Sequence, residues 1–368
     1  MRLRTAFWAG VGALVAALVA TRPLPGWPVF ARPAAVAASG LAEAGTDWLP
    51  VTSPSVHAVT LVAERDGSLS AAWFGGTREG ARDVSIHFAR WRDGKWSEGR
   101  VVAARESVRA ATGRHVRKLG NPVLHRDRAG RLHLFYVTTA FGGWSCAMLH
   151  HQVSADGGAT WSKPQRLVTS PFLNISTLVR GPAVDLADGG FMVPAYFEFL
   201  SKNPLWLRFD AAGRFVERRA PPSPPDLLQP AVATADGERG NAYLRDGGTG
   251  QRSVWRMTTA DGGRTWSWPA PLSLPNPNAG VAALAADQGV WLVANPVPRG
   301  RQRLALLKSA DGASFATTAL LEDEQGPDRE FSYPALALAP DGTVHLAYTY
   351  DRKRLKHRWF RPIGAPLR

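Results

Sequence analysis

The chain has 368 residues, a formal net charge of +14 and a single cysteine, Cys146, so an internal disulfide is excluded. A hydrophobic share of 45%, with 36 glycines and 28 prolines, excludes a disordered chain and favours a turn-rich β protein. The basic excess suits an anionic ligand, but the sequence has no basic helix or RNA-binding signature. We therefore expect no nucleic-acid partner, and no cofactor or metal is implied.

The N-terminus has the plan of an export signal. A basic start, residues 1–4, precedes a run of sixteen mostly apolar residues, 5–20, which is shorter than the roughly 20 residues that span a membrane comfortably. We expect residues 1–20 to be a signal or a membrane anchor, the one segment expected to contact a membrane. The protein would then be periplasmic or extracellular, either free or anchored to the inner membrane. Residues 21–47 are expected to be a Pro/Ala-rich linker, and residues 48–362 the folded domain.

One octet recurs along this domain. Nearly full copies stand at residues 154–161 and 259–266, a shorter copy at 309–315, and weaker ones end at Trp96 and Phe215. Asp and Ser pin a tight turn, Gly supplies a positive φ, and the aromatic returns to a core. The five box aromatics are successively 65, 54, 51 and 49 residues apart, close to a propeller blade of about 40 to 50 residues with loop insertions.

A second turn alternates with the first. Four segments have a Gly turn followed by an alternating apolar strand, as in the inner hairpin of a blade: residues 64–73, 127–136, 186–195 and 339–348. Together the two patterns predict an all-β, six-bladed β-propeller. We expect the last strand, near residues 355–360, to complete a blade begun at the N-terminus and so to hide both sheet edges.

The octet resembles the Asp box of sialidases (neuraminidases). Over nearly all of residues 48–360 the chain is similar to bacterial predicted neuraminidases with Asp-box (BNR) repeats. The resemblance implies a sialidase-like propeller that removes a terminal sialic acid or a related acidic sugar from a glycan, as an exo-acting glycoside hydrolase. Such an enzyme needs arginine forks for the sugar carboxylate, a neutral tyrosine nucleophile that avoids charge repulsion, and a carboxyl group that protonates the leaving oxygen.

The resemblance assigns three residues of this site. Tyr333, in a Tyr-x-x-Leu stretch before an Asp-Gly turn, matches the nucleophile. Arg301 matches the arginine that stands eight residues before the serine of a box, with Arg303 as an alternative one strand step away. Arg245, at the end of a strand after an acidic turn, matches a second arginine.

The acid that protonates the leaving group is expected in the loop that ends near residue 83. Asp83 matches the family's place best, and Glu79 shares the loop. Arg78 and Arg82 flank the pair, and their charges would lower rather than raise a carboxyl pKa. Arg78 is also a candidate contact for an acidic sugar.

Three departures from the family pattern stand out. His57 occupies the place of the family's first arginine, and Thr349 or Tyr350 the place of the glutamate that buttresses it. Gln229 lies near the position of the glutamate that activates the tyrosine, and an amide cannot take a proton from a phenol.

Other residues could compensate for these losses. Glu198 or Glu330 could replace the missing base, and Arg180 could supply a replacement cation. The sequence thus leaves open a hydrolase, a non-catalytic propeller that binds acidic glycans, and a purely structural or partner-binding propeller.

Overall fold

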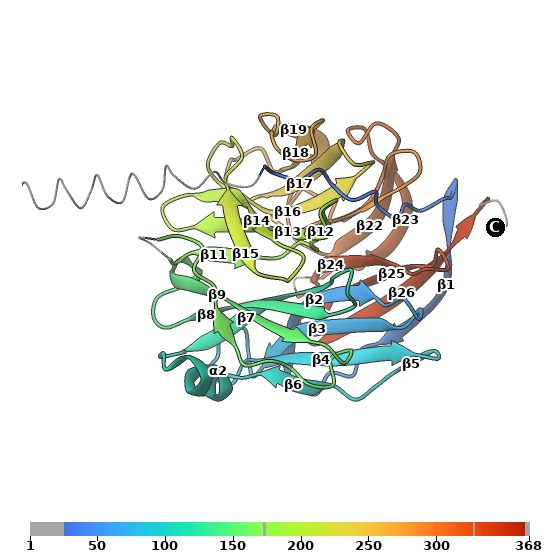
Figure 1. Cartoon of the computed structure of the whole chain (residues 1–368). Helices are drawn as coiled ribbons and strands as arrows, with labels where there is room; N and C mark the ends of the chain where they lie inside the picture. Colours follow the sequence, from blue (N-terminus) through green and yellow to red (C-terminus); the bar gives the residue numbers. More distant parts are fainter. Residues whose placement is uncertain (1–25, 172–173, 327, 365–368) are drawn as a thin grey trace, which may run out of the picture.

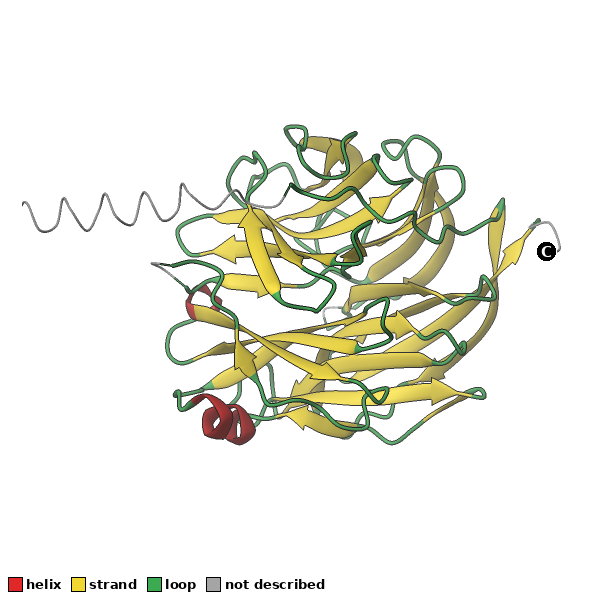
Figure 2. Cartoon of the chain, viewed as in Figure 1, coloured by secondary structure: helices red, strands yellow, loops and turns green. Residues whose placement is uncertain are grey.

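The computed structural model describes residues 26–171, 174–326 and 328–364. In these residues the strands form six antiparallel sheets, which stand as blades around a central channel (Figure 1). Helix is confined to α2 (Arg105–Thr112) and the short 3-10 turn η1 (Trp144–Cys146), as the colouring of Figure 2 shows for the described chain. The predicted all-β, six-bladed β-propeller is confirmed.

The first three blades follow one another in the chain. The first contains β2 (Ser55–Ala63), β3 (Leu69–Gly76), β4 (Ser85–Arg92), β5 (Lys95–Trp96) and β6 (Arg100–Ala103). The second contains β7 (Lys118–Arg126), β8 (Leu132–Thr139), β9 (Ala147–Ser154) and β10 (Gln165–Arg166). The third contains β11 (Thr177–Val179), β12 (Val184–Asp185), β13 (Phe191–Glu198), β14 (Lys202–Phe209) and β15 (Phe215–Arg219).

The last three blades repeat this order, and the final blade combines both ends of the chain. The fourth contains β16 (Leu227–Thr234), β17 (Gly240–Asp246), β18 (Ser253–Thr259) and β19 (Ala270–Pro275). The fifth contains β20 (Ala282–Ala285), β21 (Val290–Ala294), β22 (Arg303–Ser309) and β23 (Ala316–Asp323). The sixth contains β24 (Phe331–Leu338), β25 (Val344–Tyr350), β26 (Arg354–Ile363) and β1 (Gly40–Trp48).

The sixth blade closes the ring as predicted. Strand β1 pairs antiparallel with β26, from Gly40 opposite Ile363 to Trp48 opposite Lys356. The interpretation of residues 21–47 as a linker is therefore wrong for the part described, since residues 40–47 belong to the propeller. A Pro/Ala-rich composition does not reveal a strand whose partner lies some 310 residues later in the chain.

The segment before β1 is packed as well. Trp27, Phe30 and Val36 are at most 2% exposed, and residues 31–34 lie across one end of the central channel. There they border a cavity of about 300 Å³ together with the far ends of the innermost strands of all six blades. The signal or anchor expected at residues 1–20 lies outside the described residues. In the described part of the chain, no helix has the length and apolar character to cross a membrane.

The predicted box turns lie between the third and fourth strands of their blades. In the copy at 259–266, the Thr259 hydroxyl donates to the Asp261 carboxylate at 2.9 Å. The same carboxylate accepts from the Thr265 amide at 2.9 Å and from the Thr265 hydroxyl at 2.6 Å. The copy at 154–161 repeats this pattern around Asp156. Asp in the box therefore acts as a structural pin and not as a catalytic group.

The box aromatics join adjacent blades. The Trp266 ring lies 4.9 Å from the ring of Trp206 on the preceding blade, and Phe315 lies 5.5 Å from Tyr243 in the same relation. Because such rings bury large apolar areas, each box contributes to the contact between blades as well as to its own turn.

Replacing Asp261 with alanine is expected to lower the free energy of unfolding by about 1–2 kcal/mol, since the turn loses several hydrogen bonds at once. Urea unfolding measures the change. Asp287→Ala is the matched control, because Asp287 is exposed and its carboxylate bonds to no described residue. Equal stability of the two variants would contradict a pinning role for the box aspartate.

Candidate active site

Four innermost strands share an irregularity near one end of the channel. Each of β2, β7, β16 and β24 has a shift in register, and each carries there a residue with φ between 49° and 52°: Ala58, Asn121, Gln229 and Tyr333. A β-bulge bends its strand and re-aims a side chain, and a left-handed backbone at a residue other than glycine costs of order 1–3 kcal/mol. Such strain clusters at functional sites, which makes this end of the channel the candidate site.

The phenol of Tyr333 lies against an arginine from another blade. Arg245, near the end of β17, donates from Nη1 to the Tyr333 oxygen at 3.1 Å and to Gln229 Oε1 at 2.9 Å. Its Nε donates to Asn278 Oδ1 at 2.5 Å. Arg301, in the loop between β21 and β22, donates to the Asn278 carbonyl at 2.8 Å. The sequence-predicted residues Tyr333, Arg245 and Arg301 are thus brought together.

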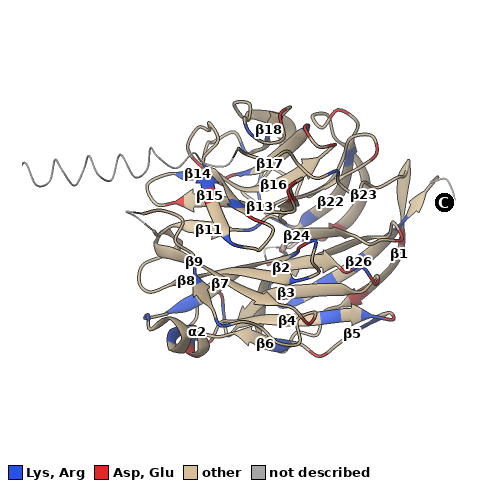
Figure 3. Cartoon of the chain, viewed as in Figure 1, with Lys and Arg blue, Asp and Glu red and all other residues tan. Residues whose placement is uncertain are grey.

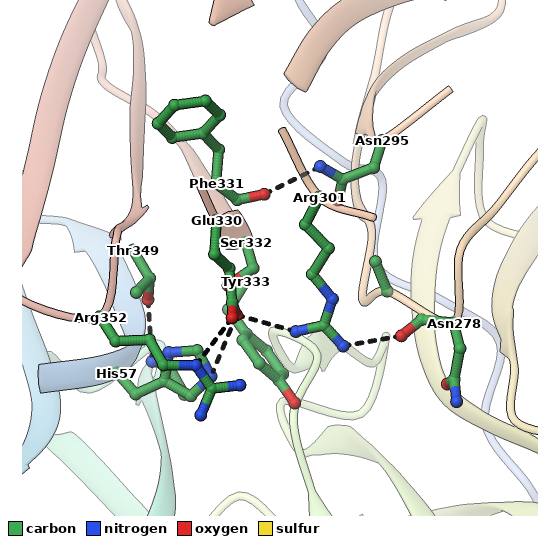
Figure 4. Close-up of polar contacts among 12 residues, drawn as sticks. His57, Asn278, Asn295, Arg301, Glu330, Phe331, Ser332, Tyr333, Thr349 and Arg352 are labelled. Carbon is green, nitrogen blue, oxygen red and sulfur yellow. Dashed lines mark hydrogen bonds and ion pairs between the residues drawn. The ribbon is translucent and has the colours of Figure 1, made fainter. Parts of the chain in front are cut away.

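Glu330 links these groups to a further arginine (Figure 4). Its carboxylate accepts from Arg301 at 2.9 Å and from Arg352, in the turn between β25 and β26, at 2.7 Å. Burial favours its neutral form, but the bond from Arg352 and the charge of Arg301 outweigh it and hold the Glu330 pKa at about 2. Glu330 is therefore an ionised anchor for two guanidinium groups and a poor proton acceptor.

His57 lies next to this ion-pair cluster. It is 2% exposed, its ring centroid is 4.4 Å from that of Tyr333, and its Nε2 is 3.9 Å from Glu330. Burial, followed by the charge of Arg352, lowers the His57 pKa well below 6.5. His57 could contact an acidic sugar as a cation only when protonated, and at neutral pH its lowered pKa leaves the ring uncharged. Arg352 supplies the cation in this region, and no spacing in the sequence singles it out.

The arginines change the acidity of the nucleophile candidate. Burial alone would raise the Tyr333 pKa, but the charges of Arg245 and Arg301 exceed that effect, so the pKa is lowered from its ordinary value near 10. A phenol whose pKa is lowered by cations reaches a nucleophilic, ionised form more readily.

Arg180 is also close to Tyr333 but differs in its surroundings. Its guanidinium lies 5.0 Å from the ring centroid, and its nitrogens donate to the carbonyls of Val59 and Pro334. The residue is 6% exposed, and burial lowers its pKa to about 10. Arg180 therefore supports the Tyr333 ring from within, and its role as a replacement cation stays a prediction.

The loop expected to carry the acid directs its two carboxyl groups to different partners. Asp83 is exposed, and its carboxylate accepts from the amide and hydroxyl of Thr77, whose hydrogen bonds lower its pKa. Glu79 instead reaches the cluster and pairs with Arg352 at 2.6 Å. Arg78 is exposed and contacts no described residue of the Tyr333 cluster, which we define as Tyr333, Arg245, Arg301, Glu330 and Arg352. The lowered pKa does not favour Asp83 as the acid, and the choice between Asp83 and Glu79 stays a prediction.

Glu198, at the end of β13, has the opposite electrostatics. Burial raises its pKa, and the charges of Lys202 and Arg245 only partly offset that effect. Glu198 therefore holds its proton more strongly than an ordinary glutamate does.

Besides Arg352, sequence reasoning missed three uncharged polar residues of the site: Asn121, Tyr196 and Asn278. The buried Tyr196 hydroxyl accepts from Asn121 at 3.2 Å and from Gln229 at 3.4 Å. One pattern could have found Asn121, since Asn121, Gln229 and Tyr333 each precede a proline at the same place in their blades. Arg303, the alternative to Arg301, faces outward and pairs with Asp323 at 2.9 Å.

The basic residues of the chain do not form one continuous surface around the site. Lys and Arg are spread over many blades rather than gathered in one stripe (Figure 3). Among the described residues, no group of three or more His, Cys, Asp and Glu side chains is arranged to hold a metal ion.

Comparisons with solved structures agree with the fold. A Hadza microbial sialidase superposes with a TM-score of 0.69 at 18% identity, covering 83% of this chain and 66% of its own. The NanB sialidase of Streptococcus pneumoniae gives 0.68 at 12% identity, covering 95% and 72%. The intramolecular trans-sialidase of Ruminococcus gnavus gives 0.67 at 16%, covering 91% and 100%. The chain thus spans slightly less than two thirds of the Hadza sialidase.

No curated protein matches the sequence. Residues 67–346 match the family model described as a BNR repeat-like domain, which is most of the chain and includes the Asp-box turns. The protein therefore belongs to the BNR repeat-like domain family, with the six-bladed fold of the sialidases.

Proposed function

We propose that this protein is an exo-acting glycoside hydrolase of sialidase type, which removes a terminal sialic acid or a related acidic sugar from a glycan. The observation that carries the proposal is the Tyr333 phenol, hydrogen-bonded to Arg245 and lowered in pKa by two arginines. A tyrosine nucleophile suits an anomeric carbon that bears a carboxylate, because a neutral phenol approaches it without charge repulsion.

The sugar carboxylate is held by Arg245, Arg301 and Arg352. Planar guanidinium groups match a carboxylate with paired hydrogen bonds, which are stronger than those between neutral groups. Arg301 and Arg352 are oriented by their shared partner Glu330, and Arg245 by Gln229 and Asn278. In the family pattern one of the three arginines stands at the place of His57. Here Arg352 supplies the third cation instead.

Arg245 and Arg301 activate the nucleophile in place of a carboxylate base. Gln229 cannot accept the phenol proton, and Glu330, with a pKa of about 2, is a weak base. Arg245 and Arg301 stabilise the phenolate directly, so the proton can leave to solvent as the phenol oxygen approaches the anomeric carbon. Glu198 is the proposed donor of the proton to the leaving glycosidic oxygen, because burial raises its pKa.

A second candidate is a non-catalytic propeller that binds acidic glycans. Gln229 favours it, since an amide stands where a base is expected and is occupied by Arg245. In this case the three arginines bind the sugar, and the phenol is only a contact.

Purified protein is expected to release the fluorophore from a fluorogenic sialoside and to bind free sialic acid. Arg301→Ala is expected to weaken that binding about 10- to 100-fold, the effect of one lost charge-assisted fork. Arg303→Ala is the matched control, because Arg303 lies two residues away and faces outward. Calorimetric titration and fluorescence measure the two activities.

The outcomes separate the candidates. Binding that depends on Arg301 without product would favour the non-catalytic propeller. If Arg301→Ala and Arg303→Ala weaken binding equally, or if sialic acid does not bind at all, both candidate functions are contradicted, since both require an acidic sugar at this site.

A further inference from the structure

A second pocket adjoins the Tyr333 cluster across Asn278. It has a volume of about 710 Å³ and lies between three loops of the fourth and fifth blades, lined by Asp246, Gly248, Gly250, Arg252, Asn276, Pro277, Asn278, Pro298, Arg299 and Gly300. Asn278 belongs to both places, since its side chain and carbonyl accept from Arg245 and Arg301. The pocket therefore borders the proposed sugar site at Asn278, and its volume falls within the range of about 300–1,000 Å³ typical of ligand pockets.

Buried polar side chains hold the walls of this pocket in place. Asp246, which is 3% exposed, accepts from the amides of Gly248, Thr249 and Arg252 at 2.8–3.0 Å. On the opposite wall the Asn276 side chain, which is fully buried, bonds the amide and the carbonyl of Ala279. The backbone N–H of Asn276 donates to the Arg252 carbonyl at 2.7 Å and so ties the two walls together. A preformed pocket binds with little loss of conformational freedom.

Two guanidinium groups in the pocket lack partners. Arg252 and Arg299 are exposed, and neither side chain makes a hydrogen bond or ion pair with any residue that the structure describes. Arg245 and Arg301, by contrast, are oriented by other side chains. The carboxylate of Asp246 is directed at its own loop, so the pocket keeps two cations available to an anionic ligand.

We propose that this pocket binds a second acidic sugar, joined directly to the one at Tyr333. The preferred substrate is then an oligosaccharide that ends in two adjacent sugars, each with an anionic group. The inference rests on the proposed function and deepens it. Arg252 and Arg299 bind the carboxylate of the second sugar, and the loop pinned by Asp246 holds Arg252 at the rim.

Calorimetric titration of the full chain tests the inference, in a Tyr333→Phe background that prevents cleavage. Three ligands are compared: sialic acid, a disaccharide of two sialic acids, and the same disaccharide with the second carboxylate converted to a primary amide. We expect the dianionic disaccharide to bind about 10-fold or more tightly than sialic acid, and the amide to lose this advantage. The double variant Arg252→Gln/Arg299→Gln should lose it as well. Arg109→Gln, an exposed change on α2 in the part of the ring opposite the pocket, should keep it.

Each result decides a different point. If sialic acid binds but the disaccharide binds no more tightly, the second site is refuted and the proposed function stands. If the double variant keeps the advantage, the two arginines do not bind the second carboxylate and the site is refuted. If Arg109→Gln loses the advantage as well, the advantage comes from overall charge and the site is again refuted. If neither ligand binds, the proposed function fails and the inference fails with it.

Discussion

Replacing Tyr333 with phenylalanine is expected to reduce turnover of a sialoside by about 10³-fold or more, while the fold and the binding of free sialic acid change little. The variant removes only the oxygen that accepts from Arg245 and would form the bond to the sugar. The ring contacts with His57 and Arg180 remain. Steady-state kinetics and thermal unfolding measure the two effects.

The matched control is Tyr350→Phe. Tyr350 also carries a hydrogen-bonded hydroxyl, here to Glu324 at 2.6 Å, but it lies outside the Tyr333 cluster. This variant should retain turnover. Retained turnover in Tyr333→Phe would instead remove Tyr333 from the mechanism.

Mild acid is expected to destabilise the protein steeply. Eight of the nine histidines have a lowered pKa, mainly through burial, and for His125, His151 and His357 it falls to about 3. In the unfolded chain these rings take up protons below about pH 6.5, whereas in the folded state they stay neutral. Stability is therefore fully present above pH 6.5 and is lost as the pH falls toward 3.

The expected size of this loss is large. Each such ring contributes about 1.4 kcal/mol per pH unit, or about 2 kcal/mol between pH 6.5 and 5. Several together are comparable with the whole stability of a typical domain, about 5–15 kcal/mol. Urea unfolding between pH 7.5 and 5 measures the slope.

A variant can isolate one of these rings. His357 is fully buried and lies 3.0 Å from His345, so His357→Gln removes one site of proton uptake from the unfolded chain. The variant should show a shallower dependence of stability on pH, whatever its stability at pH 7.5. A wild-type protein equally stable at pH 7.5 and 5 would contradict the explanation.

The fold could be predicted because its signal is repeated. The Asp-Gly turns and the aromatics after them depend on local hydrogen bonds, as at Asp261 and Trp266, and local chemistry is visible in sequence. Tyr333, Arg245 and Arg301 were found because their positions are tied to these turns.

The rest of the site depends on the tertiary structure. Burial and Arg352 lower the His57 pKa well below its ordinary value, and neither cause can be read from its neighbours in the chain. The choice between Asp83 and Glu79 depends on the path of one loop, which turns Asp83 toward Thr77 and Glu79 toward Arg352. The strand β1 was hidden for the same reason, because its pairing partner comes from the opposite end of the chain.

The pairing of β1 with β26 has a consequence for how the molecule is made. The first strand of the propeller is synthesised before the five other blades, and its partner β26 only after them. Until then β1 has no sheet to join, and the edge of the sixth blade does not yet exist. Contacts of such high sequence separation form slowly, because a long loop must close first. Assembly of the ring therefore ends with the pairing of β1 and β26, once β26 has been synthesised.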